Sequence, residues 1–187
     1  SLQTTTVRLA NAVVEHCLLS LLDPAAPPIY VTDDGADAVV LRDYLNEHFL
    51  SERTTSDFEI EGFKFSQIHL LVRARKNTAH LVHLCAAKRS VKHIRLSETI
   101  PELTGPLNHT EGDKPVAYAG YVVGDLLDRR VHQERDEFWL GQVYAEDGTD
   151  TPRLVTVSQK DIEKKACDAA ATFLQPLLGP YRELRRE

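Results

Sequence analysis

The sequence predicts an α+β fold, with a mixed sheet of four to five strands and helices packed on one face. Apolar residues recur at helical spacing near both ends of the chain, whereas the apolar period changes to two between these ends. The resulting order is helix, strand, helix, a run of strands, loop, strand and helix. Such an order is typical of the α+β class.

The N-terminal part predicts a helix, a short strand and a second helix. The first helix spans 4–22 and ends before Pro24, because proline cannot continue a helix. A strand at 28–32 then leads to Asp34-Gly35, a turn dipeptide. Apolar residues on one side of 37–50 predict the second helix.

A run of strands follows. Apolar alternation on both sides of Gly62 predicts a hairpin, and two further strands follow at 66–75 and 79–87, with Asn77 at the turn between them. The next predicted strand covers 91–96. These segments form the centre of the sheet and loop region, which we expect over 28–144.

Turns and loops separate the remaining elements. A turn at 88–90 precedes the strand just described, and the Pro- and Gly-rich stretch 97–115 predicts a long loop. The apolar run 116–123 predicts a buried strand, followed by a short helix or turn over 124–130. Residues 131–140 form a loop that runs into an extended segment.

The C-terminal part predicts a long helix after a polar loop at 145–152. Ser158 precedes this helix and Asp161 occupies its third position, so the two resemble a capping box. The apolar stripe extends the helix over 158–178. We see no linker that would split the chain, and we expect residues 1–187 to form a single domain.

Composition excludes several classes of protein. The 187 residues carry a net charge of −6, which disfavours a dedicated nucleic-acid binder, and no apolar run reaches the length of a membrane span. Three widely spaced cysteines, Cys17, Cys85 and Cys167, disfavour a disulfide framework and suit a reducing cytoplasm. The sequence has no methionine, so we expect a piece excised from a longer protein.

No catalytic or metal-binding set of residues stands out. His83 and Cys85 share one face of a predicted strand and His80 lies on the other, so we expect packing rather than a zinc site and no metal in this chain. The acidic pair Glu59 and Glu61 predicts a solvated face. An independent hydrolase is disfavoured because no set of nucleophile, base and orienting group is apparent.

Three segments resemble one family of ATPases. In the stretch 131–140, Val131-His132, Arg135 and Glu137 resemble the N-V-H-P-A-K-x-E motif of the mismatch-repair ATPase MutL. The stretch 85–92 resembles its V-N-G-R-x-V strand and turn, although Ala86-Ala87 replace Asn-Gly. The opening of the chain resembles bacterial ATP-binding proteins of the GHKL group, which also includes the heat-shock-ninety proteins.

This resemblance implies the transducer domain of a GHKL ATPase, with the fold of ribosomal protein S-five domain two. In that family the transducer contributes one basic side chain to the ATP γ-phosphate and relays nucleotide state. The matching residue is Arg135, and Lys88, Arg89 and Lys92 are weaker candidates for the same contact. ATP, Mg²⁺, the catalytic Glu and the Mg-binding Asn belong to a preceding domain, which is the implied partner. A homodimer and the client protein stay open.

A binding module of another class is the alternative. Six basic residues near strand ends predict a basic edge that would contact nucleic acid or protein: Arg73, Arg75, Lys76, Lys88, Arg89 and Lys92. The acidic total disfavours tight non-specific nucleic-acid binding, which is mainly electrostatic.

Overall fold

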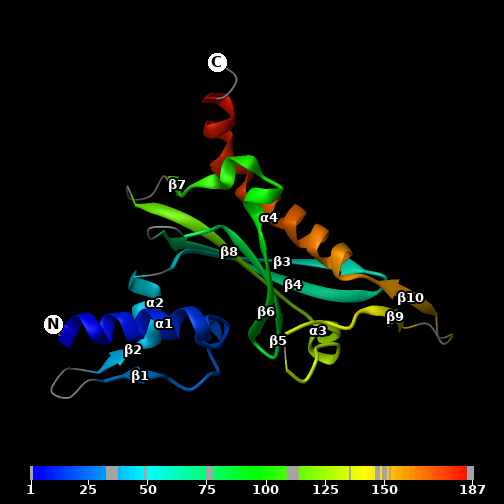
Figure 1. Ribbon diagram of the computed structural model, residues 1–187, viewed down its shortest axis with the longest axis horizontal. Coiled ribbons are helices and arrows are strands. Elements are labelled where there is room, and N and C mark those ends of the chain that lie inside the picture. Colours follow the sequence, from blue (N-terminus) through cyan, green and yellow to red (C-terminus); the bar gives the residue numbers. More distant parts are fainter. Residues whose placement is uncertain are drawn as a thin grey trace. The chain divides into compact units, whose positions relative to one another are not determined.

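The computed structural model describes residues 2–32, 38–48, 50–74, 78–108, 114–134, 136–145, 148, 151 and 153–184 (Figure 1). The chain divides into two compact units, residues 1–51 and 52–187. Among the described residues, no helix is long and apolar enough to cross a membrane.

The smaller unit consists of two helices and a two-stranded ribbon: α1 (Leu2–Leu22), β1 (Tyr30–Val31), β2 (Val39–Val40) and α2 (Leu41–His48). The helices pack through fully or nearly fully buried side chains, which include Val14, Leu18, Leu41 and Leu45. The Arg42 guanidinium donates hydrogen bonds to the carbonyls of Leu21, Asp23 and Ala26. This arginine therefore satisfies carbonyls at and just beyond the end of α1, where no further helical turn supplies donors.

Both helices predicted for this part of the chain are present. The second helix begins four residues later than expected, because Val39 and Val40 pair with β1 before the chain turns into α2. The predicted strand is reduced to Tyr30–Val31. The turn dipeptide Asp34-Gly35 lies outside the described residues.

A mixed sheet forms the larger unit, and the predicted α+β class is confirmed. Its strands are β3 (Leu50–Ile60), β4 (Phe63–Arg73), β5 (Leu81–Ala86), β6 (Arg89–Arg95), β7 (Leu107–Asn108) and β8 (Pro115–Val123). The strand order is β3-β4-β8-β5-β6, and β7 pairs with the beginning of β8. The β5–β8 pair is parallel, whereas β4–β8 and β5–β6 are antiparallel. The short β7 makes the sheet one strand larger than predicted.

Strand adjacency differs from the predicted order. The hairpin around Gly62 is present, and both turn residues, Glu61 and Gly62, have positive φ. The strands predicted at 66–75 and 79–87 are not neighbours, because β8 lies between β4 and β5. Asn77 lies outside the described residues. The tight turn consists of Ala87 and Lys88, one residue earlier than predicted, and Arg89 already belongs to β6.

Two segments expected as loops contain short regular elements. The 97–115 stretch holds β7 and two 3-10 helices, η1 (Leu96–Glu98) and η2 (Pro101–Thr104). A further hairpin, β9 (Gly141–Tyr144) paired with β10 (Leu154–Val157), flanks the predicted polar loop. These strands have only four residues each, too few to give a clear alternating pattern in the sequence.

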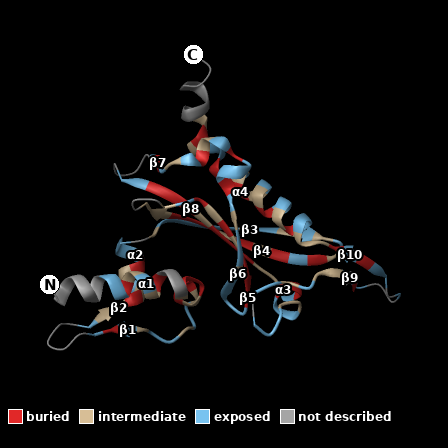
Figure 2. Cartoon of the chain, in the orientation of Figure 1, coloured by how far each residue is buried: buried red, intermediate tan, exposed pale blue. Residues whose placement is uncertain are grey.

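Helix α4 (Gln159–Leu184) covers one face of the sheet (Figure 1). Its buried stripe is Ile162, Ala166, Ala170, Leu174 and Leu178, and these side chains join the core formed by β4, β5 and β8. Long buried stretches run along β4 and β8 in Figure 2. The predicted helix is confirmed, although it continues to Leu184, past the predicted end at residue 178.

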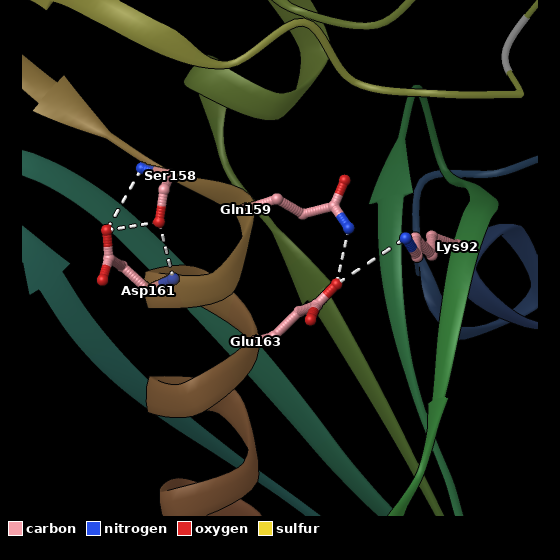
Figure 3. Close-up of polar contacts among 5 residues, drawn as sticks. All are labelled: Lys92, Ser158, Gln159, Asp161 and Glu163. Carbon is pink, nitrogen blue, oxygen red and sulfur yellow. Dashed lines mark hydrogen bonds and ion pairs between the residues drawn. The ribbon is translucent and has the colours of Figure 1, made fainter.

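The predicted capping box begins this helix (Figure 3). The Ser158 hydroxyl and backbone N–H both donate to the Asp161 carboxylate, and the Asp161 N–H donates back to Ser158 Oγ. These hydrogen bonds from Ser158 hold the pKa of Asp161 below its usual value. The start of α4 is therefore fixed by local sequence.

Candidate functional site

The four residues predicted to contact phosphate have different settings. Arg135, the principal candidate, lies outside the described residues. Lys88 and Arg89 are exposed at the turn between β5 and β6, and Lys92 is exposed further along β6. The turn and its surroundings therefore form the part of the candidate site that can be described.

The turn of the β5–β6 hairpin has an unfavourable backbone conformation. Ala86 pairs with Arg89, so Ala87 and Lys88 form a two-residue loop, with φ of 47° and 63°. Hairpin loops with positive φ at both positions favour Asn-Gly, because asparagine and glycine tolerate this left-handed conformation better than other residues. The Asp128 carboxylate accepts a hydrogen bond from the Ala87 N–H at 2.8 Å. This contact joins the turn to α3 (Asp125–Arg129).

The loop that follows α3 is closed at its base. Val131 and Phe138 form an isolated antiparallel bridge, and the His132 N–H donates to the Glu137 carbonyl at 3.0 Å. Next to this bridge, the Arg130 guanidinium lies 4.2 Å from the centre of the Trp139 ring. The loop begins three residues after Asp128, so the helix that contacts the Ala87–Lys88 turn also leads into the loop.

Lys92 lies away from the turn. It is paired across the ladder with Leu84, a core residue on the side of α4, and its ammonium lies 4.0 Å from the Glu163 carboxylate (Figure 3). The Gln159 side-chain amide donates to the same Glu163 oxygen. The structure therefore places Lys92 beside α4, whereas Lys88 and Arg89 lie at the tip of the hairpin.

Among the described residues of the predicted basic edge, Arg73 does not lie at the same end of the sheet as Lys88 and Arg89. Arg73 pairs with Val116 at the beginning of β8, whereas Leu84 pairs with Val122 near its end. Six residues of strand separate these positions, or about 20 Å. Arg73 and the Ala87–Lys88 turn therefore lie at opposite ends of the sheet. Arg75 and Lys76 lie outside the described residues.

His80 and Cys85, two members of the predicted histidine and cysteine set, are buried and have structural roles. His80 precedes the strand, and its buried ring accepts the Tyr118 N–H at Nδ1 and donates to the Gly105 carbonyl from Nε2. Burial lowers the pKa of His80 and raises the pKa of Cys85 to about 12. A buried thiol with such a pKa is a poor nucleophile. In the described ranges, no three His, Cys, Asp or Glu residues gather as a metal site.

The acidic pair Glu59 and Glu61 borders a cleft of about 530 Å³. The lining residues come from the end of β3, from β10 and from the first turns of α4, and they carry both charges: Glu59, Ile60, Glu61, Thr156, Asp161, Lys164, Lys165 and Asp168. Glu61 also lies 3.4 Å from the Arg153 guanidinium. Asp161 is engaged in the helix cap. Lysines of α4 and the Arg153 guanidinium therefore offset part of the negative charge of these carboxylates.

A largely buried polar cluster, which sequence analysis missed, lies between β3, β4, β8 and α4. We call it the polar seam: Ser56, Gln67, His69, Tyr118 and the Ala166 carbonyl. Ser56 Oγ lies 2.7 Å from His69 Nε2, and His69 Nδ1 lies 2.7 Å from the Tyr118 hydroxyl. Gln67 Nε2 lies 3.0 Å from both the Tyr118 hydroxyl and the Ala166 carbonyl. The signal in the sequence was two polar residues, Gln67 and His69, at inward positions of an alternating strand.

The seam contains a serine, a histidine and an orienting hydroxyl, but its hydrogen-bond directions do not activate the serine. The Ala166 carbonyl only accepts, so Gln67 Nε2 donates to it and also to the Tyr118 oxygen. Tyr118 then donates its own proton to His69 Nδ1, because the alternative leaves a buried hydroxyl proton unpaired. His69 Nε2 therefore carries a proton and donates to Ser56. A protonated Nε2 cannot accept the serine proton, as a general base must.

Most polar atoms of the seam have hydrogen-bond partners, and its histidine is also packed against an aromatic ring. The rings of His69 and Phe173 stack with centroids 5.0 Å apart, and burial lowers the pKa of His69 to about 4 and raises that of Tyr118. Gln67 Oε1 is the one buried side-chain acceptor without a partner among the described residues. These contacts connect the sheet with the middle of α4.

Comparison with protein-family models, with curated proteins and with solved structures gives no match for this chain.

Proposed function

We propose that this chain is the transducer domain of a GHKL-type ATPase in a reducing cytoplasm, with an architecture like ribosomal protein S-five domain two. In this proposal, Arg135 contacts the γ-phosphate of ATP. The nucleotide and Mg²⁺ are held mainly by a preceding domain. The family resemblance of the sequence is the origin of the proposal.

One observation supports it. The two segments that resemble the family, 85–92 and 131–140, lie about 40 residues apart in the sequence. The Ala87 N–H donates to Asp128 of α3, which leads directly into the loop that carries Arg135. The hydrogen bond therefore ties both segments to the same short helix, as a site formed by the two segments requires.

The chemistry follows from charge. A guanidinium at the terminal phosphate stabilises the charge that develops as the phosphoryl group is transferred. It also interacts differently with ATP and ADP, and such a difference in binding energy can shift a conformational equilibrium. The acids on either side of Arg135, Glu134 and Asp136, would compete with phosphate for the guanidinium.

ATP hydrolysis by the longer parent protein tests this function. We expect Arg135→Ala to reduce turnover by 10²-fold or more, in the range for removing a group that stabilises transition-state charge. The matched control is Arg153→Ala, since Arg153 forms an ion pair with Glu61 at the turn between β3 and β4. The isolated chain 1–187 should be inactive. Unchanged turnover in Arg135→Ala, or turnover by the isolated chain, would contradict the proposal and favour the interaction-module or enzyme alternatives.

A further inference from the structure

His83 and His93 form a cross-strand pair of imidazoles. They are directly opposite each other in the antiparallel β5–β6 ladder, and opposed residues project from the same face of a sheet. The neighbours of His83 on β5, Val82 and Leu84, belong to the core beneath α4. Because side chains alternate along a strand, both histidines lie on the face opposite α4.

The spacing of the two rings is close to that of a shared metal ligand pair. The ring centroids are 6.1 Å apart and the ring planes are tilted by 50°. Two imidazoles that bind one tetrahedral zinc ion through ring nitrogens at 2.0–2.1 Å have centroids about 5 Å apart. The difference of about 1 Å is within the reach of a small side-chain rotation, and His93 is exposed.

Two contacts hold the His83 ring in place. Its Nδ1 lies 2.8 Å from the Ser90 hydroxyl, and its plane stacks on the Tyr121 ring at 4.7 Å with an angle of 8°. When Nδ1 donates its proton to Ser90, the lone pair of Nε2 is left for a metal ion. Metal-ligating histidines almost always have such a partner on the second nitrogen, because it fixes the tautomer and the ring orientation.

We propose that His83 and His93 bind a divalent transition metal, such as Zn²⁺ or Cu²⁺, in an open site. Imidazole suits these ions better than Mg²⁺ or Ca²⁺, which prefer oxygen ligands. The described part of the chain supplies no third His, Cys, Asp or Glu here, so water or an exchangeable ligand fills the remaining positions. Open zinc sites usually have three protein ligands, so a site with two binds the ion more weakly and leaves more positions for exchangeable ligands. The site does not depend on nucleotide binding.

Calorimetric titration of the chain with ZnCl₂ tests the site. We expect one ion to bind per chain, and His93→Asn to weaken the affinity at least 10-fold. The exposed position of His93 makes it the safer variant, because His83 is packed on Tyr121. Ser90→Ala retains both ligands but removes the partner of Nδ1, so it should weaken binding by about 10-fold.

Two other exposed histidines provide the controls. His48→Asn and His132→Asn should leave zinc binding unchanged, because neither residue belongs to the β5–β6 ladder that carries the pair. Absence of saturable binding, or unchanged binding by His93→Asn, would overturn the proposal. An equal loss of affinity in either control would assign the binding to scattered surface histidines and overturn it as well.

Discussion

The polar seam and the Ala87–Lys88 turn belong to the same sheet but differ in how they are stabilised. In the seam, Gln67 and His69 of β4 both contact the Tyr118 hydroxyl of β8, and Gln67 also donates to the Ala166 carbonyl of α4. The turn has two residues in a left-handed conformation, and its Ala87 N–H donates a hydrogen bond to Asp128 of a neighbouring helix. The comparison indicates that side chains from several elements hold the seam together, whereas the Ala87 N–H of the turn is bonded to the Asp128 carboxylate of a neighbouring helix.

The largest effect is expected at Gly120, beneath the seam. A Cβ at this position would lie 2.5 Å from the Tyr118 hydroxyl, which cannot move easily because it contacts both Gln67 and His69. We expect Gly120→Ala to lower the free energy of unfolding by about 3 kcal/mol, as overpacking of a core does. Chemical denaturation measures this.

Gly105→Ala is the matched control. Gly105 has an extended backbone with φ of −143°, and a Cβ there would meet nothing within 4 Å. The unfolding free energy of Gly105→Ala should stay within about 0.5 kcal/mol of that of the unmodified chain. Equal losses in both variants would show that the seam is no more tightly packed than a surface loop.

The second largest effect is expected from acid, which should lower the free energy of unfolding through His69 in the seam. The pKa of His69 is about 4 in the folded chain, below its unperturbed value of 6.5, because burial disfavours the charged ring. The unfolded chain therefore binds more protons between these values. Stability from this residue is complete above pH 6.5 and declines as pH falls towards 4, by up to about 3 kcal/mol.

His69→Gln removes the titrating group but keeps a polar side chain. We expect its unfolding free energy to decrease less than that of the parent chain between pH 7 and pH 5, measured by denaturant titration at each pH. Parallel curves for the two proteins would contradict the neutral, buried state of His69.

A smaller loss of stability is expected when the contact between Asp128 and the turn is removed. Asp128→Ala leaves the Ala87 N–H without its acceptor, and we expect about 1 kcal/mol of destabilisation. Amide hydrogen exchange at Ala87 should accelerate. Asp125→Ala, in the same helix, is the control, and an equal acceleration in both variants would show that the 2.8 Å contact does not hold the turn.

The smallest expected effect has the opposite sign. Lys88→Gly relieves the strain of φ at 63° and should stabilise the chain by about 0.5–1 kcal/mol, because glycine accepts this conformation. Lys92→Gly, within β6, should instead destabilise it. Thermal unfolding compares the two. If Lys88→Gly also destabilises, the side chain of Lys88 contributes more than the strain of its backbone.

Local sequence determined a large part of the fold. The two long helices, the capping box of Ser158 with Asp161 and the hairpin at Gly62 depend on residues close in the chain, so periodicity and turn chemistry predict them. The charged segments around Lys88 and Arg135 were also apparent from the sequence alone. The role of Arg135 stays a prediction.

Only the tertiary structure decided the strand order and the contacts between residues that are distant in the sequence. Insertion of β8 between β4 and β5 separates strands that follow each other in the sequence, places Arg73 far from Lys88, and creates the polar seam around Tyr118. The contact of Asp128 with the Ala87–Lys88 turn is of the same kind. Such contacts join residues about 40 to 100 positions apart, and they depend on which strands become neighbours, which side-chain periodicity does not specify.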